Sequence, residues 1–388
     1  MRAFRFRTLL LGIVVVAAAC GSSKSSSSDN SSKSSPSTTG QAASSLYSAS
    51  KPLKVAFIMN GPVTDQGFNT AVYKGIKAVQ EKYGSTVAVT YKESVPESPQ
   101  SSQVIDSLVQ DGMEAIFANS FGYHTYMAAA AAKYPNVKFL QWQSSEVGPN
   151  LSEFYFTVDE SWYLAGMAGG AASKSGKIGM VASFPISSLL AQVNSFQLGA
   201  QAVNPGATTR VVWLNSWYDP GKATQAAQSL VSSGVDTLVN ALNESSVVQV
   251  AASHDLPVVG QAVNQQTFGP NSWLTGAEFI FGPYFIKQIG DMLAGKWQGN
   301  QNYIGGTSDG VTAISAFGPR YDKAVPADIQ QKIKDRQTQM KSGSFNPWQG
   351  PIADQSGTVQ VPAGKDLSAA DRRSIKYLVK GVLGTAGS

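Results

Sequence analysis

The sequence predicts an α/β protein in which two similar lobes each contain a parallel sheet. Short apolar runs and helix-period runs alternate along most of the 388-residue chain, an order typical of parallel sheets with helices on both faces. The alternation comes as two successive series, and the second begins after Ser161. A chain of this length with 43% hydrophobic and 14% charged residues is sufficient for two domains with cores.

The first series starts with the buried-strand pattern LKVAFIMN at residues 53–60, followed by a helix at 68–84 with apolar residues on one face. Further strands are expected at 87–94, 114–120, 138–142 and 153–159, with helices at 101–112 and 126–135. The second series predicts strands at 177–184, 208–215, 237–242, 256–262 and 273–279, and helices at 162–176, 188–204, 223–234 and 246–255. The remaining chain predicts helices at 284–297, 326–343 and 366–384, a strand at 310–317, and a surface hairpin or extended loop at 345–364.

The first nineteen residues have the features of a signal peptide. Three arginines precede the apolar run LLLGIVVVAAA, which is too short to span a bilayer permanently. The run ends in AAAC, which resembles a bacterial lipobox, so Cys20 is expected to be lipidated. A plain signal peptide with an incidental cysteine is the alternative. Cys20 is the only cysteine, which excludes an intrachain disulfide.

The predicted organisation therefore has five parts. After the signal peptide at 1–19, a Ser-rich stretch too polar to form a core makes residues 20–50 a linker that starts at the lipidated cysteine. A first lobe at 51–159 and a second lobe at 160–280 follow. Residues 281–388 are expected to return mainly to the first lobe and to end in the hairpin and helix.

The net charge of +5 gives no reason to expect a nucleic-acid partner. Without the three arginines of the signal peptide, 27 basic residues stand against 25 acidic ones. No Lys/Arg cluster remains in the rest of the chain.

Ligands of open parallel sheets bind beyond the carboxyl ends of the strands. Aromatic and carboxamide side chains recur at these predicted ends, and basic side chains are nearly absent apart from Lys222. The candidate binding residues are Asp65, Phe68, Asn69, Phe121, Tyr123 and Trp142 in the first lobe, and Trp217, Asn243, Asn264 and Phe281 after it. Rings can stack on aromatic faces while carboxamides both donate and accept. The pattern favours a flat, neutral ligand such as a nucleobase or nucleoside.

A structural interpretation stays open for most of these residues. The alternative to ligand binding is core packing for Phe68, Phe121, Tyr123 and Trp142. For Asp65 the alternative is helix capping, and for Asn243 and Asn264 it is turn formation. Trp217 is the strongest candidate, because the DPG that follows it needs only Asp219 as a cap and Pro220 at the first helical position. The cap does not explain the indole.

The sequence gives little support to catalysis. His124 and His254 are the only histidines, and no GxSxG, P-loop, HExxH or Cys/His metal spacing occurs. We therefore expect no enzyme, no cofactor and no metal.

Several blocks resemble one known family. The stretches VAFIMNGPVTDQGFNTAVYKGI, ANSFGYH, NPGATTRVVWLNSWYDPGK and GPIADQSGTVQVPAG resemble the basic membrane protein family of bacterial lipoproteins, which are substrate-binding proteins of ABC importers. The resemblance runs from about Leu53 to Gly384. It implies the type I periplasmic-binding-protein fold, with two Rossmann-like lobes joined by a hinge.

The resemblance also implies a ligand and roles for the residues. Family members bind purine nucleosides, and one branch is associated with purine bases. Phe68 and Trp217 would sandwich the ring, Phe121 and Tyr123 would line the first-lobe wall, and Asn243 and Asn264 would bind polar edges. In the purine-base branch, acidic residues occupy the positions of Asn243, Asn264 and Phe279, so the hydrogen-bonding pattern differs in this chain.

Together these features predict a lipid-anchored, extracytoplasmic and monomeric binding protein that delivers a purine-like molecule to an ABC permease and ATPase. A ligand-binding sensor for a membrane receptor would use the same site and is the first alternative. A nucleoside hydrolase is the second, and strand ends so poor in aspartate disfavour it.

Overall fold

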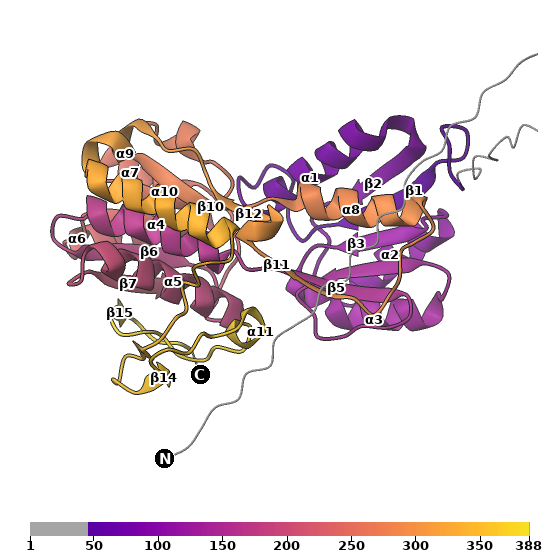
Figure 1. The fold of residues 1–388 in the computed structure, drawn as a ribbon. Helices are drawn as coiled ribbons and strands as arrows, with labels where there is room; N and C mark the ends of the chain where they lie inside the picture. Colours follow the sequence, from indigo (N-terminus) through magenta and orange to yellow (C-terminus); the bar gives the residue numbers. More distant parts are fainter. Residues whose placement is uncertain (1–45, 388) are drawn as a thin grey trace, which may run out of the picture. The chain divides into compact units, whose positions relative to one another are not determined.

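The computed structural model describes residues 46–387 (Figure 1). Cys20 and the rest of the predicted leader and most of the linker lie outside the described residues. The expected α/β architecture is confirmed. Every strand and helix predicted between residues 53 and 297 is present, most of them with shifted ends.

The sheet of the first lobe has six parallel strands in the order β11-β5-β4-β3-β1-β2. Their bounds are β1 Leu53–Ile58, β2 Val87–Lys92, β3 Ala115–Ala118, β4 Lys138–Trp142, β5 Leu151–Phe156 and β11 Asn302–Gly305. The edge strand β11 has no counterpart among the sequence-based expectations.

Helices cover both faces of this sheet, and the side chains of β1 therefore point alternately into two cores. Phe57 packs in the core beneath α1 (Phe68–Tyr83) and α8 (Phe281–Leu293), which contact each other. Ile58 points to the opposite core beneath α2 (Gln100–Gln110) and α3 (His124–Lys133). This period-two alternation is the property of a strand buried on both faces.

The sheet of the second lobe has seven strands in the order β12-β10-β9-β8-β6-β7-β15. Their bounds are β6 Lys177–Ala182, β7 Thr208–Trp213, β8 Thr237–Ala241, β9 Val258–Ala262, β10 Trp273–Phe279, β12 Thr312–Ile314 and β15 Val382–Leu383. Helices α4 (Asp159–Ala172) and α5 (Ser187–Val203) cover one face, and α6 (Pro220–Ser232) and α7 (Ser246–Ser253) cover the other. The pair β10–β12 is antiparallel, and the other pairs are parallel.

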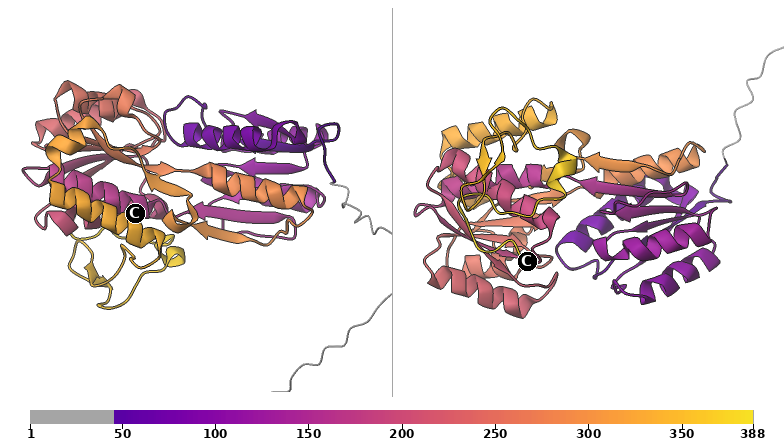
Figure 2. Two further views of the ribbon diagram at one scale, coloured as in Figure 1. Left: turned by 45° about the horizontal axis from the view of Figure 1, so that its top comes forward. Right: turned by 90° about the horizontal axis from the view of Figure 1, so that it is seen from below.

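Three segments connect the two lobes (Figures 1 and 2). They join β5 to α4, β10 to α8, and β11 to β12. Each is short, which suits a hinge between two lobes that have their own sheets.

The expectation that the return segment belongs mainly to the first lobe is wrong after Gly305. α8 and β11 do join the first lobe, but β12 pairs with β10 and α10 (Ala327–Lys341) packs on α4. Ile329, Ile333 and Met340 form the buried stripe of α10. This helix therefore covers the α4 side of the second lobe.

The predicted final helix at 366–384 is also wrong. Only α11 (Ala369–Arg372) is helical there, and β15 pairs with β7 instead. Asn194 on α5 binds the backbone of residues 377 and 379, so tertiary hydrogen bonds prevail over local helix propensity. The preceding hairpin is confirmed as β13 (Ile352–Ala353) paired with β14 (Val359–Val361).

Among residues 46–387, no helix is both long and apolar enough to cross a membrane.

Candidate functional site

A cavity of about 580 Å³, its open mouth included, lies where the carboxyl ends of both sheets meet. Its aromatic lining residues are Phe68, Phe121, Trp142, Tyr155, Phe156, Trp217 and Phe279. Its polar lining residues are Asn60, Ser120, Gln143, Ser188, Gln192, Asn243 and Gln261. Both lobes contribute to both sets, as the strand-end argument predicts.

Phe68 stands at the centre of an aromatic cluster that includes Phe279 at the end of the second-lobe strand β10. Its ring makes edge contacts with Trp142, Phe279 and Phe281 at centroid distances of 5.3, 5.2 and 5.3 Å. Such edge-to-face pairs are favourable beyond the area that they bury. The ring is half-buried and still lines the cavity, so Phe68 has both the packing role and the exposure that the sequence left as alternatives.

Trp217 lies in a different environment, on the loop between β7 and α6. The predicted cap is present, because Asp219 Oδ1 accepts from the backbone N–H of Lys222 at 3.0 Å and Pro220 begins the helix. The indole has one ring neighbour, Phe184, at 4.9 Å. It is half-buried and lines the cavity, so neither the cap nor a core accounts for it.

Of the other predicted residues, Phe121, Trp142 and Asn243 line the cavity as well. Phe121 is 44% exposed, whereas Trp142 belongs to the aromatic cluster. Asn243 stands at the end of the second-lobe strand β8.

Five predicted residues do not line this cavity, and three of them lie in the core or in a turn. Tyr123 is fully buried in the first-lobe core, where its hydroxyl donates to the carbonyl of Val95 at 2.6 Å. Phe281 packs in the core behind Phe68. Asn264 caps a short turn by accepting from the N–H of Gln266 at 2.9 Å. For these three, the structural interpretation accounts for the position of the side chain.

Asp65 and Asn69 border a neighbouring cavity of about 430 Å³, its open mouth included, which is also lined by Asn60, Trp217 and Asn243. The Asp65 carboxylate is occupied by the loop itself. It accepts from the N–H groups of Gly67, Asn69 and Thr70 at 2.8, 3.1 and 3.0 Å. Its capping role is therefore present, and it shapes the loop from which Phe68 enters the cleft.

Gln192 is a lining residue that the sequence analysis missed. Its Oε1 accepts from the indole N–H of Trp162 at 3.0 Å. Since an indole only donates, this bond fixes the amide and leaves its amino group as a donor. The signal was the polar content of α5: Gln192, Asn194 and Gln197 are buried on a helix that is buried nearly all round, and buried polar groups need partners.

Two hydrogen bonds cross the cleft beside the cavity. The N–H of Phe68 donates to Asn243 Oδ1 at 3.3 Å, and Gln265 Nε2 donates to the carbonyl of Gln66 at 2.7 Å. Gly67 lies against Asn243 so closely that an added Cβ would press on its Cα and lie 2.9 Å from its Cβ. The lobes are thus closed on this side, and closure depends on the absence of a side chain at residue 67.

The electrostatic character of the cavity is neutral. Among the described lining residues, none is Asp, Glu, Lys, Arg or His. Glu244 lies next to Asn243 in the chain but binds the N–H of Ser246 at 2.5 Å, and burial raises the pKa of its carboxyl group. No group of three or more potential metal ligands comes together within residues 46–387.

Comparison with known proteins gives a consistent result. Residues 53–344 match the family model described as ABC transporter substrate-binding protein PnrA-like. The purine-binding protein BAB2_0673 of Brucella abortus is 32% identical over 86% of this chain and 94% of its own. The putative ABC transporter glucose-binding protein TsgA13 of Haloferax volcanii is 27% identical over 78% of this chain and 76% of its own.

The comparison with solved structures agrees. An ABC transporter solute-binding protein from Conexibacter woesei superposes with a TM-score of 0.64 at 20% identity, covering 76% of this chain and 98% of its own. The two-lobed type I periplasmic-binding fold is therefore confirmed.

Proposed function

The chain belongs to the PnrA-like family of ABC transporter substrate-binding proteins, and from this premise we propose that it binds a neutral, purine-like molecule between its lobes. Membership in this family makes it a binding protein with a small-molecule ligand and with a permease and an ATPase as partners. The family is not an enzyme family.

One observation carries the choice of ligand: the cavity combines aromatic rings from both lobes with carboxamides, and its described lining contains no charged side chain. A purine ring stacks on aromatic faces, with about 1–3 kcal/mol per stacked base. Its edges alternate donors and acceptors, which Asn and Gln can match. An anionic ligand would normally require Arg, Lys or a helix N-terminus.

The roles of the individual residues follow from their positions. Phe68 and Trp217 come from different lobes and are proposed to hold the two faces of the ring. Asn243 and Gln192 are proposed to bind its polar edges. Asn243 also accepts from the first-lobe backbone at 3.3 Å, so the same residue links ligand binding to closure of the lobes.

The similarity to a putative glucose-binding protein suggests a sugar as the competing ligand. Sugar hydroxyls donate hydrogen bonds, and carboxylates are strong acceptors of such bonds. No carboxylate is among the described lining residues, and the carboxylates of Asp65 and Glu97 border the neighbouring cavity and are engaged by the protein. We therefore favour a purine.

Calorimetry tests this choice. The protein is titrated with adenine, hypoxanthine, adenosine and glucose, and mass spectrometry identifies any molecule that co-purifies. Binding of at least one purine and no binding of glucose is expected. Binding of glucose without any purine would overturn the proposal.

We further propose that the protein acts outside the cytoplasm, as a monomer anchored by a lipid on Cys20, where the chain has the lipobox-like sequence AAAC. Cys20→Ala should release the protein from the membrane fraction or stall its processing. A fully processed Ala variant that still partitions with membranes would contradict the anchor. A sensor function would use the same cavity, and import of the ligand by cells carrying the cognate permease distinguishes the two.

A further inference from the structure

The last part of the chain packs on the second lobe. Residues 345–387, here called the C-terminal segment, place β15 beside β7. Asn194 on α5 donates to the carbonyl of Tyr377 at 2.8 Å and accepts from the N–H of Val379 at 2.9 Å. The segment is therefore fixed to α5 and to the sheet edge of the second lobe.

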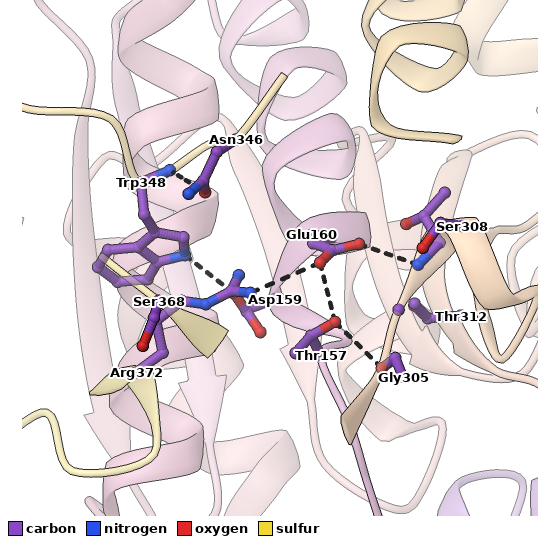
Figure 3. Close-up of polar contacts among 12 residues, drawn as sticks. Thr157, Asp159, Glu160, Gly305, Ser308, Thr312, Asn346, Trp348, Ser368 and Arg372 are labelled. Atoms are coloured by element: carbon purple, nitrogen blue, oxygen red, sulfur yellow. Dashed lines mark hydrogen bonds and ion pairs between the residues drawn. The ribbon is translucent and has the colours of Figure 1, made fainter. Parts of the chain in front are cut away.

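A buried ion pair adds to this attachment (Figure 3). Arg372 is 4% exposed and pairs with Asp159, the first residue of α4. The indole of Trp348 donates to the same carboxylate at 2.8 Å. All three side chains are buried, so the position of the neighbouring residue, Arg373, is well defined relative to α4.

Arg373 points the other way and contacts the first lobe. Its guanidinium pairs with Glu153 on β5 and donates to the carbonyl of Ser144 at 3.0 Å. It also lies 5.0 Å from the ring centre of Tyr155. Among the hydrogen bonds and ion pairs of the described residues, those of Arg373 are the ones that join the C-terminal segment to the first lobe.

These contacts adjoin the wall of the cavity. Tyr155 lines the cavity, and so does Gln143, whose chain neighbour Ser144 supplies the carbonyl that Arg373 binds. Gln143 has φ of 52°, the left-handed region that is unfavourable for a residue other than glycine. A hydrogen bond at the next carbonyl helps to hold this turn.

The positive charge of Arg373 is balanced by the carboxylate of Glu153, with which it pairs. Glu153 is fully buried; burial raises the pKa of its carboxyl group and the nearby Arg373 opposes that rise. The pair thus supplies a rigid contact without giving the cavity a net charge.

We propose that Arg373 is a positioning residue for ligand binding, through which the C-terminal segment of the second lobe holds the Tyr155–Gln143 wall of the first lobe in its binding geometry. The part that concerns affinity rests on the proposed function. Nothing in this role requires Arg373 to touch the ligand.

A purely structural role would predict a different outcome, and a pair of variants separates the two. Arg373→Met alone leaves Glu153 buried without its counter-ion, which destabilises the fold whatever the role of the contact. Arg373→Met combined with Glu153→Gln removes both charges, so most of the stability should return. The contact with the cavity wall stays absent in both variants.

Thermal melting and calorimetry with adenine are measured on the full chain for the parent, both variants and Lys380→Met, an exposed residue of the same segment. The double variant is expected to melt near the parent and to bind adenine roughly three- to thirtyfold more weakly, the range found for residues that act through others. Lys380→Met should match the parent. A double variant with parental stability and parental affinity overturns the proposal.

Amide hydrogen exchange without ligand tests the inference independently of the proposed function. Peptides covering residues 142–156 should exchange faster in the double variant, while peptides covering β7 should not change. If the parent does not bind adenine, the proposed ligand is wrong, and exchange still decides the role of Arg373. Unchanged exchange in 142–156 contradicts that role.

Discussion

The cavity between the lobes and the ion-pair cluster beside it both bury polar side chains against aromatic rings. They differ in charge, because the cluster contains charged side chains and the described cavity lining does not. The cluster is formed by Glu153, Asp159, Trp348, Arg372 and Arg373. Its four charged side chains are paired within the protein, and the indole of Trp348 donates to one of them. The described lining of the cavity holds amides and hydroxyls and no charge.

Because of this difference in charge, the two regions should contribute differently to the stability of the fold and to ligand affinity. A buried ion pair satisfies its own groups, and removing one partner leaves an uncompensated charge. An amide in a cavity can exchange water for a ligand at low cost, since both supply hydrogen bonds. Substitutions that leave a charge of the cluster unpaired should therefore act on folding, and substitutions in the cavity should act mainly on affinity. The double variant Arg373→Met, Glu153→Gln leaves neither charge unpaired and is the exception within the cluster.

The largest expected effect is in the cluster. Arg372→Met leaves the Asp159 carboxylate buried, and the free energy of unfolding should fall by about 3–5 kcal/mol. Urea unfolding followed by circular dichroism measures this. The matched control is Lys287→Met, because Lys287 forms an ion pair with Asp291 at 2.8 Å while its side chain is 62% exposed, and an exposed pair contributes little. Equal effects of the two substitutions would contradict the contrast.

The next effect concerns closure. Gly67→Ala introduces a Cβ that presses on the backbone of Asn243 in the other lobe, so it opposes the closed state. Affinity should fall by roughly five- to 150-fold, as overpacking costs about 1–3 kcal/mol.

Calorimetry with adenine and a thermal melt of the ligand-free protein measure the two consequences of Gly67→Ala. Gly206→Ala is the control, because its Cβ would have only a side-chain atom of Asn204 within 4 Å, at 3.9 Å. If Gly67→Ala binds as the parent does, the lobe contact is not required for binding.

The two aromatic faces should behave differently from each other. Trp217→Ala should weaken binding by about 1–3 kcal/mol, roughly ten- to a hundredfold, with little change in the ligand-free melting temperature. Phe68→Ala should weaken binding similarly and also lower the melting temperature, since Phe68 contacts the rings of Trp142, Phe279 and Phe281.

The double variant tests whether both residues hold one ring. Because removal of either face already breaks the sandwich, the two losses in affinity should not add. Additive losses would indicate separate contacts. A loss of several kcal/mol of stability in Trp217→Ala would mean that the indole is core packing.

Much of the fold was predictable because its signals are local. Apolar runs and helix-period faces specified the elements between residues 53 and 297, and Asp219 and Pro220 specified the start of α6. Residues 366–384 of the C-terminal segment were predicted as a helix, because their local sequence does not reveal that Asn194 and β7 bind this part of the backbone. Those partners lie more than 160 residues away in the chain.

The site was predictable in part for a similar reason. Strand ends indicated Phe68, Phe121, Trp142, Trp217 and Asn243, all of which line the cavity. The same rule could not distinguish Tyr123, which turns into the core two residues after Phe121. Gln192 comes from a helix rather than a strand end, so only its burial in three dimensions reveals it.

The smallest expected effect is that of salt on affinity. Screening weakens interactions between charges and leaves stacking and neutral hydrogen bonds nearly unchanged. Since the described lining of the cavity is uncharged, the affinity for adenine should change less than about twofold between low and high salt. Lys222, near Trp217 in the chain, is paired with Asp219 at 3.1 Å, so Lys222→Met should give the same salt dependence as the parent. Calorimetry at two salt concentrations measures both proteins, and a tenfold or larger loss in the parent would indicate that a charged group takes part in binding.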